Sequence, residues 1–336
     1  MKNIIIPEGY HCNGTIKETE IAIKDVKDYF ERALAKELNL TRVSAPLFVK
    51  PESGLNDNLN GVERPVSFGI KEQGDAKVEI VHSLAKWKRM ALQKYGFTHG
   101  EGLYTDMSAI RRDEDTDNIH SIYVDQWDWE LIIDREERTM DTLKSIVCKV
   151  YEALKNTEVF INARYPEINK VLPTEITFIT TQELEDAYPS MTGKERECEA
   201  AKKYGAVFIM QIGDKLASGE RHDGRAPDYD DWSLNGDIIV DYPLLGIGLE
   251  LSSMGIRVDE MALKEQLVKA GCPQRSELPF QKALLEGKLP YTIGGGIGQS
   301  RICMFFLKKA HIGEVQSSIW PDDVTAYAEE HGVHLL

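Results

Sequence analysis

Near its carboxyl end, the chain contains the stretch Gly294-Gly295-Gly296-Ile297-Gly298-Gln299-Ser300-Arg301. Its spacing fits neither the Gly-x-Gly-x-x-Gly pattern of dinucleotide sites nor the phosphate loop that ends in Gly-Lys-Ser/Thr. The residues alone predict a glycine-rich turn before a helix over 299–308. That turn is either a flexible connection or a place where a ligand lies against the backbone while Arg301, just inside the helix, faces an anion.

Upstream of this stretch, the sequence predicts strands and helices without regular alternation. Thr15 and Glu18 form a capping box that begins a long amphipathic helix ending near Asn39. Further helices are predicted over 83–95, 134–157, 261–270 and 279–286. Strand patterns lie at 42–49, where Pro46 requires an edge or special position, and at 62–69, 77–82, 121–130, 176–180, 206–212, 237–241 and 249–258. This order favours an α+β fold with an antiparallel sheet flanked by helices.

The composition is that of a globular protein with an acidic surface. Hydrophobic residues make up 42% and charged residues 28%, and 40 Lys and Arg against 55 Asp and Glu leave a net charge of −15. This charge argues against tight binding of long nucleic acid, although a cleft can still bind small anions. Five scattered cysteines without a Cys-x-x-Cys pair favour a reducing compartment. Because the apolar runs are too short for a membrane span or a signal peptide, we expect a soluble, cytoplasmic protein with no membrane partner.

Several polar groupings could belong either to a site or to the surface. Gln126, Asp128 and Glu130 alternate with two tryptophans and therefore share one face of a strand, which is either solvated or the floor of a polar site. The segment 223–232 holds four carboxylates, which are typical of a solvated loop or of a site for Mg²⁺ or an ammonium group. The charged segments 111–115 and 250–257 have the same two interpretations.

Taken in order, these segments resemble the catalytic core of class II aminoacyl-tRNA synthetases. The helix and strand over 15–48, with Pro46, resemble the first motif of that class, which forms a dimer interface. The segment from Arg111 to Glu130 resembles the second motif, and Gly294 to Arg301 resembles the third, a glycine-rich strand that enters a helix.

The similarity is closer to the ammonia-dependent asparagine synthetases. It is carried by the segments His82–Arg89, Gly102–Thr105, Tyr123–Glu130, Arg225–Trp232, Glu250–Val258 and Thr292–Arg301. It implies a single catalytic domain over 1–336, with an N-terminal leader at 1–14 and a core at about 15–321. Arg112 occupies a position where the family often has Pro, so it is the alternative to the favoured Arg111 at the phosphates.

The resemblance implies that ATP, L-aspartate and ammonia give L-asparagine, AMP and PPi through a β-aspartyl-adenylate. Arg111 and Arg301 would hold the α- and γ-phosphates, and Glu250 with Asp237 would bind Mg²⁺. Gln126 and Ser253 would add contacts to the nucleotide. A homodimer is implied around Pro46.

The resemblance also implies how aspartate and ammonia bind. Lys88 and Arg257 would grip the α-carboxylate, Asp128 the α-ammonium, and Ser83 and Gln126 would add hydrogen bonds. Ammonia is mostly ammonium at neutral pH, so a carboxylate must deprotonate it. Asp57 is expected to be this base and Asp230 to assist it, and Asp230 is the alternative base.

Two other functions are possible. A complete aspartyl- or asparaginyl-tRNA synthetase would need an anticodon-binding domain, for which the residues before the first helix leave no room. An inactive paralogue that senses an amino acid would be expected to have lost a motif arginine, whereas Arg111, Arg257 and Arg301 are all present.

Overall fold

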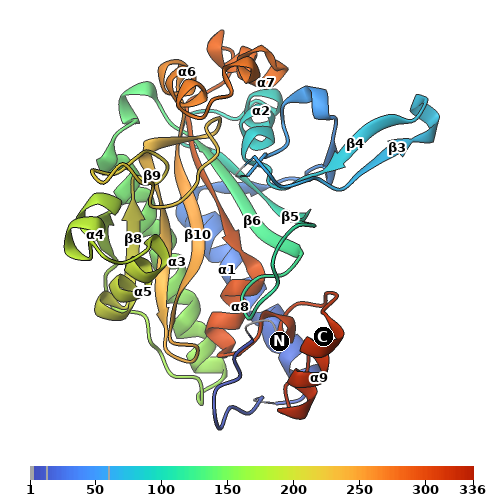
Figure 1. Cartoon of the computed structure of the whole chain (residues 1–336), viewed down its shortest axis with the longest axis vertical. Coiled ribbons are helices and arrows are strands. Elements are labelled where there is room, and N and C mark those ends of the chain that lie inside the picture. Colours follow the sequence, from blue (N-terminus) through green and yellow to red (C-terminus); the bar gives the residue numbers. More distant parts are fainter. Residues whose placement is uncertain (1–3, 13, 60) are drawn as a thin grey trace.

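A computed structural model describes residues 4–12, 14–59 and 61–336, which form one large sheet backed by helices and a small sheet that projects from it (Figure 1). Residues 1–3 and 13 of the expected leader, and Asn60 in the turn-rich segment after Asp57, lie outside the described residues. Within the described part of the chain, no helix is both long and apolar enough to cross a membrane.

The large sheet has eight strands, and its order does not follow the sequence. Across the sheet they are β1 (Leu40–Arg42), β5 (Gly102–Ile110), β6 (Tyr123–Ile132), β11 (Thr292–Gly298), β10 (Ile247–Arg257), β9 (Asp230–Tyr242), β8 (Ala206–Met210) and β7 (Thr177–Thr180). Neighbours are antiparallel except at the two edges, where β1 pairs with β5 and β7 with β8 in parallel. The small sheet contains β2 (Phe48–Val49), β4 (Ala76–Ile80) and β3 (Ser67–Ile70).

Helices lie behind the large sheet in the view of Figure 1 and around its ends. They are α1 (Ile16–Leu38), α2 (Ala85–Tyr95), α3 (Met140–Arg164), α4 (Thr181–Ala187), α5 (Gly193–Tyr204), α6 (Glu260–Lys269), α7 (Pro279–Leu285), α8 (Gln299–Leu307) and α9 (Asp322–Glu330). The antiparallel sheet flanked by helices is therefore confirmed.

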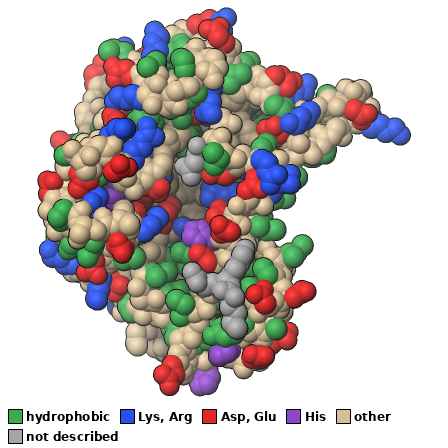
Figure 2. All heavy atoms as spheres, viewed as in Figure 1, with side chains coloured by type: hydrophobic (Ala, Val, Ile, Leu, Met, Phe, Trp, Pro, Cys, Tyr) green, Lys and Arg blue, Asp and Glu red, His purple; other side chains and the backbone are tan. Residues whose placement is uncertain are grey.

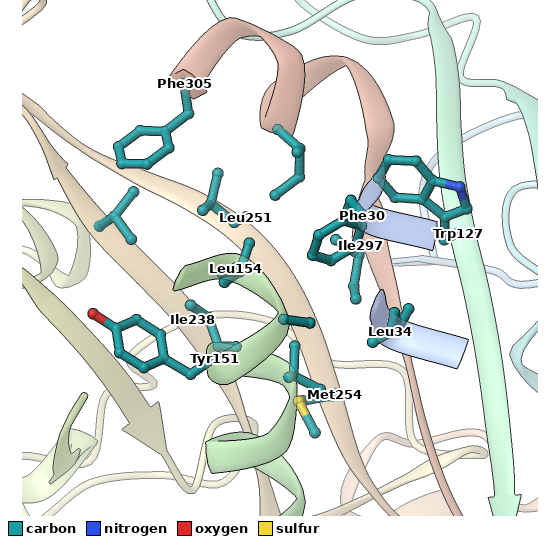
Figure 3. Packing of buried hydrophobic residues seen from close by; sticks show 14 of the residues in the cluster. Phe30, Leu34, Trp127, Tyr151, Leu154, Ile238, Leu251, Met254, Ile297 and Phe305 are labelled. Atoms are coloured by element: carbon teal, nitrogen blue, oxygen red, sulfur yellow. The ribbon is translucent and has the colours of Figure 1, made fainter. Parts of the chain in front are cut away.

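Helix α1 begins and ends as its sequence predicts. The Thr15 hydroxyl accepts a hydrogen bond from the Glu18 N–H at 3.2 Å, and the Thr15 N–H donates to the Glu18 carboxylate at 2.8 Å. Asn39 ends the helix in the left-handed region, with φ 52°. The buried stripe that includes Phe30 and Leu34 faces the sheet, and the Phe30 ring lies 4.8 Å from that of Trp127 (Figure 3).

Strand β6 separates the core from a polar face. Trp127 and Trp129 are almost fully buried in the core, where α1 and α3 pack against the sheet. Figure 3 shows Leu154 of α3 and Leu251 and Met254 of β10 in this layer. Because side chains alternate along a strand, Gln126, Asp128 and Glu130 point to the opposite face, away from α1 and α3. Asp128 on that face is only 2% exposed, so this face is not an open, solvated surface.

The glycine-rich turn predicted from the residues alone is wrong, because residues 292–298 form the central strand β11. The glycine-rich strand entering a helix that the resemblance implies is confirmed. The glycines are needed here for space. A Cβ at Gly294 would collide with the side chains of Glu130 and Arg257, and one at Gly296 would collide with Gln126. Side chains from the neighbouring strands thus cross directly over β11.

The structure changes one further prediction and adds two elements. The predicted strand at 42–49 is two short strands in different sheets, because the chain leaves the large sheet after β1 and enters the small sheet at β2. Strand β5 and helix α9 were not predicted from the sequence pattern.

The segment after α8 buries a histidine. His311 is 1% exposed, its ring packs edge-on against Trp320, and the Gly313 N–H donates to its Nδ1 at 3.0 Å. Burial lowers the pKa of His311 from 6.5 to about 4, so the imidazole is neutral in the folded protein at neutral pH.

We expect the protein to lose stability through His311 as the pH falls from about 6.5 to about 4. In this window the unfolded chain binds a proton at this histidine and the folded protein does not, so acidification favours unfolding. The shift corresponds to roughly 3 kcal/mol. Urea unfolding at neutral and acidic pH measures the loss, which should be smaller in His311→Asn. The exposed His331→Asn variant should behave as the wild type does, and an equal loss in both variants would contradict the prediction.

Candidate active site

A pocket of about 420 Å³ lies over the polar face of β6, β10 and β11. This volume is in the range of small-molecule sites, which is roughly 300–1,000 Å³. The pocket is lined mainly by polar and charged side chains, and Figure 2 shows acidic and basic groups interspersed around the hollowed middle of this face. Of the predicted site residues, those that line it are Asp57, Ser83, Arg111, Gln126, Asp128, Asp230, Glu250, Ser253, Arg257 and Arg301.

One end of the pocket combines two arginines with an acid. The Arg301 guanidinium donates to the backbone carbonyl of Glu250 at 3.0 Å, and its Nη1 lies 3.7 Å from the Glu250 carboxylate. Arg111 lines the same pocket, whereas the adjacent Arg112 is exposed at the surface. This end can therefore hold an anionic ligand between guanidinium groups.

Two neighbouring carboxylates differ in their ionisation. Burial opposes charge on Glu250, but nearby cations, chiefly Arg301 and Lys194, more than offset it and lower the pKa of Glu250 to about 2. Burial raises the pKa of Asp237 to about 6, although its carboxylate forms an ion pair with Arg225. Asp237 lies behind the pocket lining, and its buried Oδ1 has no hydrogen-bond partner among the described residues. Both groups supply the oxygen ligands that Mg²⁺ prefers.

A buried network of charges forms the floor of the other end. The Arg257 guanidinium donates to Glu130 at 2.8–3.1 Å and forms an ion pair with Asp230. Lys88 forms an ion pair with Asp128 and also donates to the carbonyl oxygen of Trp129 at 2.8 Å. The charges are thus already paired before any ligand binds, which holds each side chain in one orientation.

Lys88 differs from the expectation that it grips the substrate directly. Its side chain is fully buried behind Asp128, which lies between it and the pocket. The physical reason is that a lysine on α2 extends toward the sheet, where Asp128 and backbone carbonyls surround its ammonium group. Its place is beneath the pocket floor.

Asp57 lines the pocket, and among the described residues no cation is paired with its carboxylate. The Ser83 hydroxyl donates to one of its carboxylate oxygens at 2.9 Å, and the Leu59 N–H donates to the other at 2.8 Å. Asn56 supports this turn, because its Oδ1 accepts from the His82 N–H at 2.9 Å. Asp57 is 3% exposed, and its segment is therefore an ordered part of the pocket.

This geometry agrees with the comparison of the sequence with protein families. The model for aspartate–ammonia ligase matches residues 17–332. The chain belongs to the aspartate–ammonia ligase family. The aspartate–ammonia ligase of Clostridium perfringens is 66% identical over 336 residues, which covers all of both chains. That of Fusobacterium nucleatum is 66% identical over 327 residues, covering 97% of this chain and 99% of the relative.

Solved structures confirm the fold expected for this aspartate–ammonia ligase family member. Asparaginyl-tRNA synthetase from Pyrococcus horikoshii, complexed with asparaginyl-adenylate, matches with a TM-score of 0.63 at 15% identity, covering 90% of this chain and 70% of that chain. Asparaginyl-tRNA synthetase from Entamoeba histolytica matches with a TM-score of 0.60 at 14% identity, covering 90% of this chain and 67% of that chain. The fold is that of the class II synthetase catalytic core.

The acidic segment 223–232 does not form one metal cluster in this ligase-family chain. Three of its carboxylates pair with cations from different elements: Asp228 with Lys86, Asp230 with Arg257, and Asp231 with Arg138. Three of the four carboxylates of this segment are thus held by separate cations, and the segment is an ordered part of the structure.

Two basic residues of this family member were missed as site residues. Lys194, near the start of α5, and Arg225 both line the pocket beside Glu250. Lys194 has no local signal, because a lysine in the first turn of a helix is ordinarily solvated. Arg225 was identified only within the segment Arg225–Trp232 that resembles the family, and its site position could have been inferred from that segment.

Proposed function

We propose that this chain catalyses the ATP-dependent amidation of L-aspartate by ammonia, giving L-asparagine, AMP and PPi through a β-aspartyl-adenylate. Membership of the aspartate–ammonia ligase family carries this proposal. A pocket with guanidinium groups at one end and an acid-rich, ion-paired floor at the other supports it. ATP and the carboxylates of aspartate are anions that guanidinium groups can bind, and the α-ammonium group of aspartate is a cation that a carboxylate can bind.

Activation of the β-carboxylate requires two anions to approach each other. Arg111 and Arg301 hold the α- and γ-phosphates, and their positive charge offsets the repulsion between ATP and aspartate. Both side chains line one end of the pocket, and Arg301 is oriented by its hydrogen bond to the Glu250 carbonyl. Gln126 and Ser253, which line the same pocket, add hydrogen bonds to the nucleotide.

The acids beside Arg301 fit Mg²⁺. Glu250 is ionised because its pKa is lowered to about 2, and Asp237 presents a buried carboxylate oxygen without a hydrogen-bond partner among the described residues. Glu250 is the first candidate ligand, and Asp237 the second. Bound Mg²⁺ would neutralise phosphate charge. The ion pair between Asp237 and Arg225 fixes the carboxylate next to Glu250.

Aspartate binds over the buried network with its β-carboxylate toward the phosphates. Arg257 takes the α-carboxylate and Asp128 the α-ammonium group, with Ser83 and Gln126 as further donors and acceptors. Lys88 acts from behind: its ion pair with Asp128 orients that carboxylate toward the pocket.

Asp57 is the base that deprotonates ammonium, and Asp230 assists it. Burial raises the pKa of Asp230, which by itself would favour Asp230 as the base. Its carboxylate, however, is paired with Arg257, and a carboxylate held by a guanidinium group is a weak proton acceptor. Asp57 accepts only neutral donors, from Ser83 and Leu59, among the hydrogen bonds described for its carboxylate.

The test is PPi release with ATP, Mg²⁺, aspartate and ammonium chloride, alongside chromatography of the amino-acid product. We expect PPi and asparagine in equal amounts, and neither without aspartate. Glutamine in place of ammonium should support little asparagine formation. Formation of aspartyl- or asparaginyl-tRNA would indicate a tRNA synthetase. The absence of both activities in the folded protein would indicate an inactive paralogue.

We also propose a cytoplasmic homodimer formed through the region around Pro46. Leu47 and Phe48 are 48% and 42% exposed, and the Phe48 ring lies 5.3 Å from that of the similarly exposed Phe68. An exposed apolar patch formed by Leu47, Phe48 and Phe68 favours an interface.

The cytoplasmic location is supported by the cysteines, because the free thiols of all five suit a reducing compartment.

We expect sedimentation to give a dimer at micromolar concentration, and Phe48→Asp to shift it toward the monomer, because a carboxylate would be buried without a partner. Val268→Asp, at a 67% exposed position on α6, is the matched control and should remain dimeric. A strictly monomeric wild-type protein would contradict the proposal.

A further inference from the structure

The leader segment, here residues 4–12, is tied to the loop that follows Arg111. Asn118 in this loop is 6% exposed. Its side-chain Oδ1 accepts a hydrogen bond from the Ile5 N–H at 2.9 Å, and its Nδ2 donates to the Ile5 carbonyl oxygen at 2.7 Å. One amide side chain therefore pairs with both backbone groups of a single residue, in the manner of a strand partner.

Asn118 also holds the segment that follows α8. Its Nδ2 donates to the carbonyl oxygen of Ala310 at 2.7 Å, and its own carbonyl accepts from the Ile312 N–H at 2.7 Å. Three parts of the chain that are far apart in sequence thus meet at one buried residue: the leader segment, the loop 111–121, and the carboxyl-terminal segment.

The residues on either side of these contacts form a wall of the pocket. Ile119, His120 and Ser121 line it from the loop, and Ile312 lines it from the carboxyl-terminal segment. Arg301 donates through its Nε to the Ile119 carbonyl at 3.4 Å, so the wall contacts one of the two arginines at the anion-binding end. Asn118 itself lies behind the wall.

We propose that Asn118, together with the backbone of Ile5, is a positioning residue for ATP. The pair fixes the wall formed by residues 119–121 and Ile312 in its binding geometry and thereby sets the affinity for the nucleotide. This inference rests on the proposed function, because it assigns ATP to the end of the pocket that contains Arg111 and Arg301. A wall that must be ordered upon binding reduces affinity, whereas a wall ordered beforehand does not.

A purely structural role would have a different signature. If the contacts only anchored the leader segment, their loss would lower the melting temperature and affect both substrates alike. The leader segment has a second anchor that provides a comparison: the Tyr10 hydroxyl donates to the Glu314 carboxylate at 2.8 Å. Loss of that bond loosens the leader segment but leaves the contacts of Asn118 in place.

The test uses the full chain and four variants. Asn118→Ala removes the three side-chain hydrogen bonds of Asn118, and Ile5→Pro removes the N–H that donates to it. Ile5→Ala is the matched control, since it keeps the N–H and changes only a side chain that is 55% exposed. Tyr10→Phe removes the second anchor. ATP affinity is measured by equilibrium titration without aspartate, and KM for ATP and aspartate by PPi release.

We expect Asn118→Ala and Ile5→Pro to weaken ATP binding by about 3–10-fold each, because the effect on ATP is indirect and matches the usual net contribution of a single hydrogen bond. In both variants the KM for aspartate should change by less than about twofold. In Ile5→Ala and Tyr10→Phe, the affinity for ATP and the KM for ATP and for aspartate should also change by less than about twofold. The double variant Asn118→Ala/Ile5→Pro should bind ATP no more weakly than Asn118→Ala alone, because both changes remove the same support.

Unchanged ATP affinity in Ile5→Pro and in folded Asn118→Ala would overturn the inference, as would an equal loss of affinity for ATP and aspartate. If Asn118→Ala does not fold, Ile5→Pro decides alone. The proposed function is judged separately, by whether the wild-type protein makes asparagine. A wild-type protein that binds ATP but makes no asparagine would refute that function, while the ATP titrations would still decide the role of Asn118.

Discussion

Arg301→Ala is expected to abolish adenylate formation. In the proposed complex Arg301 neutralises phosphate charge at the end of the pocket where Glu250 adds a further negative charge 3.7 Å away. Without the guanidinium group, phosphate and carboxylate would face each other in a partly desolvated site. Leaving such a charge without its partner costs roughly 3–5 kcal/mol, which corresponds to about a 10²–10⁴-fold loss of rate. Aspartate-dependent exchange of labelled PPi into ATP measures this step directly.

The adjacent arginines supply the controls for this prediction. Arg112 is exposed, so Arg112→Ala should retain near-normal exchange, whereas Arg111→Ala should lose most of it. Arg301→Lys keeps one positive charge but not the two-pronged geometry, and should fall between wild type and Arg301→Ala. Near-normal exchange in Arg301→Ala would refute the role of Arg301 at the phosphates.

Asp57→Asn is expected to separate the two half-reactions. Asparagine has nearly the same shape, can still accept from the Leu59 N–H, and can remain hydrogen-bonded to the Ser83 hydroxyl, so the turn should stay in place. Adenylation, which needs Arg111 and Arg301 but no base, should survive. Attack of ammonia should slow by roughly 10²–10⁴-fold, because ammonium would no longer be deprotonated in the site.

The measurement is PPi exchange alongside asparagine formation in the same Asp57→Asn preparation. Part of the lost rate should return at higher pH, where more ammonia is neutral, and with hydroxylamine, which is neutral at about pH 7. Asp230→Asn is the comparison: it removes an ion-pair partner of Arg257 and should impair aspartate binding as well. Equal loss of both half-reactions in Asp57→Asn would mean that Asp57 shapes the site, and Asp230 would then be the candidate base.

Elements that depend on neighbours in sequence were predictable. The capping box of α1 is a set of hydrogen bonds between Thr15 and Glu18, three residues apart, and its apolar stripe follows helical spacing. The strand at β6 was recognised for the same reason, since its two faces alternate residue by residue. In both elements the pattern that predicts the structure lies within a short, continuous segment of the sequence.

The conformation of the glycine-rich stretch depends on residues that are distant in sequence. Glycines have low strand propensity, so Gly294–Gly298 was expected to form a turn. The structure places the stretch in the middle of the sheet, because Gln126 and Glu130 from β6 and Arg257 from β10 occupy the space that a Cβ would need. Those partners come from distant parts of the sequence, so no local pattern could reveal the reason.

By itself the sequence determined the family, the fold class and ten of the residues that line the pocket, because these depend on residue type and order. Only the tertiary structure decided what each charge faces. Lys88 lies behind Asp128, Asp237 is paired with Arg225, and Lys194 joins the site from a helix that had no functional signal. The physical reason is that a charge in a folded protein is defined by its partners and its burial, and these are set by the crossing of strands and helices that are far apart along the chain.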